Sequence, residues 1–96
     1  MAGPTDALEA GLDDTGKQVV RYLGKDPDTA TTLTAMWEQL SPRRDPWLRT
    51  GMEQTIPDLV KRGLVIVRTV RGIPRYQLSA SAREKLGPAR GPGPGT

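Results

Sequence analysis

Arginine is the residue type with the most evident chemical role in this 96-residue sequence. The chain has ten arginines and four lysines against eleven acidic residues, and no histidine or cysteine. Histidine is the commonest general base and metal ligand, and cysteine thiolates form disulfides and zinc sites. The sequence also has no phosphate-cradling glycine loop and no paired carboxylates on a core face. We therefore expect no enzyme activity, no metal site and no cofactor, and consider charge instead.

The basic residues are distributed unevenly along the chain. All fourteen lie at or after Lys17, whereas four of the eleven acids precede it. Between Lys61 and Arg83 there are six basic residues and no acidic one. A one-sided basic surface on a small domain is typical of proteins that bind a polyanion. A merely solubilising surface is the alternative that charge alone leaves open.

The two ends of the chain offer little for a core to bury. Residues 1–14 are expected to form a flexible acidic arm or an extension of the first helix, and the Gly/Pro-rich residues 87–96 are expected to be disordered. The predicted folding unit is residues 15–86, near the lower size limit for one core. No apolar run approaches the roughly twenty residues that span a membrane, and no signal peptide is visible, so we expect a cytoplasmic protein.

Two helices are predicted in the first half of the chain. The first has a capping box, Thr15-x-x-Gln18, and runs to Leu23 before Gly24, although a start as early as Ala7 stays open. The second is short and takes its N-cap from the threonine-rich stretch 29–34. It carries three residues expected in the core, Met36, Trp37 and Leu40.

A third helix is predicted over residues 46–62. Asp45 provides a capping carboxylate, a proline follows at the first helical position, and Gly63 supplies the stop. One face of the helix is apolar, with Leu48, Met52, Ile56, Leu59 and Val60. The opposite face carries Trp47, Thr50, Gln54, Asp58 and Lys61. Pro57 predicts a kink or a break near Thr55, because it removes one helical hydrogen bond.

A basic β-hairpin, here called the wing, is predicted over residues 64–78. Its strands are residues 64–70 and 75–78, the turn is 71–73, and Pro74 predicts an edge strand. A second capping box, Ser81-x-x-Glu84, opens a last short helix that ends at Leu86. The predicted fold class is therefore mainly α, with a three-helix core, a two-stranded wing and a short C-terminal helix.

The second half of the chain contains three motifs, Leu59-Val-Lys-Arg-Gly-Leu-Val, Arg75-Tyr-Gln-Leu-Ser and Arg83-Glu-Lys-Leu. Together they resemble the bacterial winged helix-turn-helix regulators, particularly the MarR and PadR groups. Leu59-Val-Lys-Arg-Gly-Leu-Val is similar to the end of their recognition helix, and Arg75-Tyr-Gln-Leu-Ser to their returning wing strand. Arg83-Glu-Lys-Leu is similar to the helix after the wing, with Ala82 where glycine is usual. The resemblance covers about residues 15–86 and is most specific over 45–86. The chain departs from the family in the long basic link 41–45, in its helical proline and in lacking long dimerisation helices.

The resemblance implies sequence-specific binding of double-stranded DNA, by a small bacterial transcriptional regulator or a plasmid or phage DNA-handling factor. The helix 46–62 would enter the major groove, and the wing would contact the backbone or minor groove. The expected base contacts are Arg49, Thr50, Glu53 and Gln54. The expected backbone and wing contacts are Arg43, Arg44, Arg68, Arg71 and Arg75. The alternatives are that these are ordinary solvated residues, or that the domain is a protein-interaction module without DNA binding.

Two further expectations concern apolar residues. Trp47 is expected to fold back over the core beside Trp37, and stacking on a sugar-phosphate backbone is the alternative. We also expect a homodimer on DNA, because two-fold pairing doubles the contacts on a palindrome. The helical stripe of Leu8, Leu12 and Val19 is the candidate pairing surface.

Overall fold

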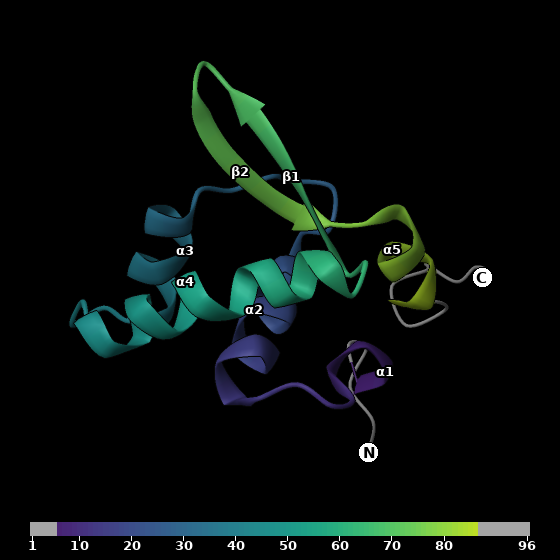
Figure 1. The fold of residues 1–96 in the computed structure, drawn as a ribbon, viewed down its shortest axis with the longest axis horizontal. Helices are drawn as coiled ribbons and strands as arrows, with labels where there is room; N and C mark the ends of the chain where they lie inside the picture. The colour runs from purple at the N-terminus through teal and green to yellow at the C-terminus, as the bar shows by residue number, and fades with distance from the viewer. Residues whose placement is uncertain (1–5, 87–96) are drawn as a thin grey trace.

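A computed structural model describes residues 6–86 of the chain (Figure 1). These residues form five helices and one antiparallel hairpin, so the predicted combination of helices with a single hairpin is confirmed. The elements are, in order, α1 (Asp6–Glu9), α2 (Asp14–Lys25), α3 (Leu33–Leu40), α4 (Pro46–Lys61), β1 (Val65–Val70), β2 (Ile73–Leu78) and α5 (Ala80–Leu86).

The helix α4 lies in front of α2, and the hairpin rises from the end of α4 toward the side where α3 lies (Figure 1). The short helices α1 and α5 pack beside each other at the other end of the molecule. No helix within residues 6–86 is both long enough and apolar enough to cross a membrane. The predicted tail 87–96 lies outside the described residues.

The core lies where α2, α4 and the base of the hairpin meet. Its fully buried side chains include Val19, Val20, Met36, Met52, Leu59, Val65 and Leu78. Each such side chain contributes roughly 1.5–3 kcal/mol by leaving water. Leu8 and Leu12 are also buried, so the expectation that residues 1–14 offer little for the core to bury is wrong. Because Leu8, Leu12 and Val19 are only 2%, 9% and 0% exposed, they cannot form the expected pairing surface.

The start of α2 differs from the prediction. Asp13 is its N-cap, and the Asp13 carboxylate accepts a hydrogen bond from the backbone N–H of Gly16 at 2.7 Å. The predicted capping box at Thr15 is therefore wrong by two residues. Gly11, with φ of +80°, separates α1 from α2 because this backbone conformation ends a helix. The helix also continues through Gly24 to Lys25, since the adjacent Leu23 is held in the core.

The predicted start of α4 at Asp45 is confirmed. The Asp45 carboxylate accepts a hydrogen bond from the backbone N–H of Trp47 at 3.0 Å. The predicted break at Pro57 is wrong, because α4 runs unbroken from Pro46 to Lys61. Proline has no backbone N–H, so the carbonyl of Glu53, four residues earlier, has no helical hydrogen-bond donor. Pro57 and Glu53 both lie on the exposed side of the helix. Water can reach that carbonyl, so the helix continues past the proline.

The hairpin brings the wing arginines into a fixed register. Arg68 lies directly opposite Arg75, and Val67 lies opposite Tyr76. The turn has two residues, Arg71 and Gly72, both with positive φ (55° and 80°), as a tight hairpin with right-handed twist requires. β2 therefore starts at Ile73, earlier than predicted.

The strand β2 is joined to the segment between α2 and α3, and the residue that follows β2 caps α5. The backbones of Thr31 and Tyr76 exchange two hydrogen bonds (2.9 and 2.7 Å) as an isolated bridge, while β2 is an edge of the two-stranded sheet, as Pro74 predicted. Ser79 caps α5, because its Oγ accepts a hydrogen bond from the backbone N–H of Ala82 at 3.1 Å. The same hydroxyl donates to the carbonyl of Gly63 at 2.6 Å. The predicted capping box at Ser81 is therefore wrong by two residues.

Candidate nucleic-acid interface

The predicted polar face of α4 is exposed in the structure. Trp47, Thr50, Gln54, Asp58 and Lys61 are all exposed, as is Glu53 beside them. The Thr50 hydroxyl donates to the carbonyl of Pro46 at 3.1 Å. Within residues 6–86 the amide of Gln54 has no hydrogen-bond partner, so it remains available to a ligand. Thr50 and Gln54 therefore present polar groups about one helical turn apart.

Arg49, the fourth predicted base contact, does not project freely into solvent. Its guanidinium lies 5.0 Å from the centroid of the Trp37 ring, and its Nη1 donates to Oγ1 of Thr34 at 3.2 Å. Its Nε lies 3.7 Å from Oε2 of Glu53. The Trp37 indole N–H in turn donates to the carbonyl of Asp45 at 2.8 Å. Arg49 therefore fastens α4 to α3, a role that helical spacing could not reveal because its partners lie on another helix.

The basic link before α4 is an ordered turn. The Ser41 hydroxyl accepts a hydrogen bond from the backbone N–H of Asp45 at 2.9 Å. The Ser41 carbonyl accepts a hydrogen bond from the backbone N–H of Arg44 at 2.8 Å. Arg44 has φ of 56°, and its Nη2 lies 3.2 Å from Oε2 of Glu38. Arg43 is exposed and has no ion pair among the described residues. Of the two predicted contacts in this link, Arg43 is thus the one free to meet a partner.

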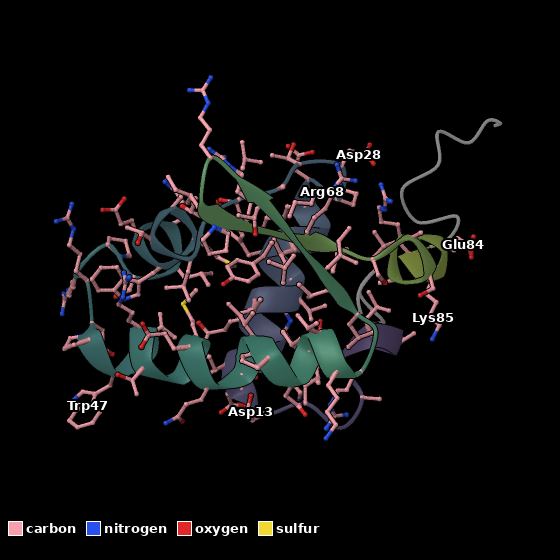
Figure 2. The ribbon with its side chains drawn as sticks, turned by 45° about the horizontal axis from the view of Figure 1, so that its top comes forward. Asp13, Asp28, Trp47, Arg68, Glu84 and Lys85 are labelled. Carbon is pink, nitrogen blue, oxygen red and sulfur yellow. The ribbon has the colours of Figure 1, made fainter. Side chains whose placement is uncertain are left out.

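The wing arginines occupy the outer half of the hairpin. Side chains alternate between the two faces of a strand, so Arg68 and Arg75 share one face, while Val67 and Tyr76 share the other. The Val67–Tyr76 face is turned toward α4, so the arginine pair is turned away from it. Arg71 lies at the tip. In Figure 2, Arg68 and Trp47 are seen on opposite sides of α4.

The arginines of residues 6–86 divide into two groups. Five of the nine are ion-paired with a carboxylate: Arg21, Arg44, Arg49, Arg62 and Arg83. The other four have no ion pair within that part of the chain: Arg43, Arg68, Arg71 and Arg75. All four belong to the predicted set of backbone contacts. Arg68 and Arg75 also face each other across the hairpin, where like charges destabilise a sheet.

Trp47 is 81% exposed, so the expectation that it covers the core is wrong. It projects from the beginning of α4, away from the body of the molecule (Figure 2). The expected place beside Trp37 is occupied by the guanidinium of Arg49. The contact of Arg49 in α4 with Trp37 in α3 leaves no place for the Trp47 ring there, and this contact between two helices could not be predicted from the sequence.

The structure also contains a groove that the sequence did not predict. It encloses about 460 Å³ between α4, α3 and the hairpin. Its lining is mostly apolar and consists of Leu33, Glu53, Ile56, Pro57, Val60, Val67 and Tyr76. Val60 and Val67 are 37% and 45% exposed. We call this surface the α4–hairpin groove.

No protein-family model, curated protein or solved structure matches the chain. Residues 6–86 contain no cluster of three or more side chains that could hold a metal ion.

Proposed function

We propose that this chain is a winged-helix domain that binds double-stranded DNA sequence-specifically, as a transcriptional regulator or a DNA-handling factor. The observation that carries the proposal is the group of four arginines without ion pairs, Arg43, Arg68, Arg71 and Arg75. Two of them are placed directly opposite each other, at a cost in stability, in a chain that pairs its other described arginines with acids. A phosphate backbone supplies the missing negative charge.

The proposed docking places the exposed face of α4 in the major groove. Thr50 and Gln54 would face base edges, and Gln54 can pair bidentately with adenine. Arg43 would meet a phosphate near the start of α4, and Arg71 would meet the backbone or minor groove from the tip of the hairpin. Arg68 and Arg75, turned away from α4, would meet only DNA that extends or bends past the hairpin. A homodimer on a palindromic site stays a prediction, without an assigned surface.

The test is fluorescence anisotropy with a random-sequence duplex of about 25 base pairs, at several salt concentrations. We expect binding that weakens linearly on a log–log plot, because each phosphate contact releases a counterion. We compare the duplex affinity of a triple variant, Arg43→Ala, Arg71→Ala and Arg75→Ala, with that of Arg62→Ala. Arg62 serves as the control because it is already paired with Asp58. A wild-type chain that binds no duplex at low salt, or a triple variant that binds as well as Arg62→Ala, would contradict the proposal.

The α4–hairpin groove favours a second candidate function, a protein-interaction module. Partly exposed valines beside an apolar hollow are typical of a peptide-binding surface. Val67→Lys places a charge at this groove, whereas the same change at the exposed Val70 places it on the other hairpin face. If the domain binds a protein partner and not DNA, Val67→Lys abolishes co-purification of that partner and Val70→Lys does not. If it binds DNA as proposed, both variants retain duplex binding.

A further inference from the structure

Among residues 6–86, Trp47 is the large apolar side chain that is most exposed to water. It is 81% exposed, whereas the next most exposed of the large hydrophobic side chains described, Ile73, is 51% exposed. Its backbone is nevertheless fixed, because its N–H donates to the capping carboxylate of Asp45 at 3.0 Å. A fixed backbone and an exposed indole ring are typical of a residue that contacts a partner, since little conformational freedom is lost when the ring binds.

Trp47 also lies in line with the polar residues proposed to face DNA bases. Trp47 and Gln54 are seven residues apart, which is about two helical turns, so they share one face of α4. The two positions are about 10 Å apart along the helix axis, roughly three base steps of duplex DNA. Arg43, exposed and without an ion pair among the described residues, lies four residues before Trp47.

Bases in a duplex are stacked, so an indole ring approaching through the major groove meets their edges. The apolar group that these edges present is the C5-methyl of thymine. On the basis of the DNA binding proposed above, we propose that Trp47 is a specificity-determining residue that packs against a thymine methyl group. This thymine lies about three base steps from the base that faces Gln54. Each site bound by α4 therefore contains a thymine at the position that faces the N-terminal end of the helix, where Trp47 lies.

The experiment uses the full chain and a duplex selected by it from a random pool. Each thymine of the bound site is replaced, one at a time, by deoxyuridine, which lacks only the methyl group. We expect one replacement to weaken wild-type binding by about fourfold, the size of one buried methyl contact. Trp47→Ala should bind the thymine and uracil duplexes equally, and Trp47→Phe should retain part of the discrimination. Lys61→Ala, an exposed change at the other end of α4, should leave the ratio between the affinities for the thymine and uracil duplexes unchanged.

Three results would overturn the inference while leaving the proposed function in place. In the first, Trp47→Ala binds the selected duplex as tightly as wild type. In the second, Trp47→Ala lowers the affinity for selected and random duplexes by equal factors, and no thymine replacement changes wild-type affinity. The third result is a blue shift of Trp47 emission on concentrating the Trp37→Phe variant without DNA, which would assign the ring to a contact between two copies. A wild-type chain that binds no duplex would overturn both proposals together.

Discussion

At the residue scale, the decisive difference is between arginines that hold the fold together and arginines that do not. Arg49 stacks on Trp37, and Arg21 forms two hydrogen bonds with the buried carboxylate of Glu9 (3.0 and 2.8 Å). Removing either changes internal contacts as well as surface charge. Arg71, by contrast, lies at the exposed tip of the hairpin without an ion pair in the described part of the chain. A substitution there reports on an external partner.

Arg71 and Gln54 should therefore respond differently to alanine substitution. Arg71→Ala should weaken selected and random duplexes by similar factors and lower the slope of log affinity against log salt by about one, because one phosphate contact is lost. Gln54→Ala should cost about 1–3 kcal/mol on the selected duplex and leave random-sequence binding nearly unchanged. Salt titrations of both variants on both duplexes measure this. Equal weakening of all sequences by Gln54→Ala would contradict the proposed docking.

At the scale of helices and strands, the sequence predicted those features that depend on local chemistry. The Asp45–Pro46 start of α4, its apolar stripe, the hairpin and its glycine turn all follow from neighbouring residues. The errors occurred where packing in the core or a competing hydrogen bond decides the outcome. The helix α2 continues past Gly24 beside the buried Leu23, and Ser79 instead of Ser81 caps α5 because its hydroxyl also bonds the carbonyl of Gly63.

The same distinction applies to the candidate site. The exposure of Thr50 and Gln54 followed from helical periodicity, but the register of Arg68 with Arg75 did not follow from the predicted turn 71–73, which is one residue longer than the observed turn of Arg71 and Gly72. The engagement of Arg49 by α3, the exposure of Trp47 and the α4–hairpin groove depend on how separate elements pack. Such packing is not encoded in local spacing.

Pro57 allows a test at this scale. Because α4 is unbroken and Pro57 is exposed, alanine at this position restores a backbone N–H without removing a core contact. We expect Pro57→Ala to raise the free energy of unfolding by about 1–3 kcal/mol, less than or equal to the full helical penalty of proline. Urea denaturation followed by circular dichroism measures it, with Pro46→Ala at the start of α4 as the control that should gain little. A loss of stability in Pro57→Ala would show that the proline ring packs usefully in the groove.

At the scale of the whole molecule, the folded unit is not the one that composition indicated. Leu8 and Leu12 are core residues, and α1 packs beside α5, so the beginning and the end of the described chain close one side of the core together. A domain of this size has few such contacts to spare. We therefore expect residues 1–12, which include Leu8 and Leu12, to contribute much more to the free energy of unfolding than the Gly/Pro-rich residues 87–96.

Two truncations measure this difference. Deleting residues 1–12 removes Leu8 and Leu12 and exposes their neighbours in the core, at about 1.5–3 kcal/mol for each lost leucine. We expect a fall in melting temperature of more than 10 °C, since 1 kcal/mol corresponds to about 4–8 °C in a domain of 60–100 residues. Ending the chain after Leu86 removes ten residues of which seven are glycine or proline, and should shift the melting temperature by only a few degrees. Thermal melts of both truncations beside the full chain decide the matter. Similar melting temperatures for the full chain and the 1–12 deletion would contradict the placement of α1 in the core.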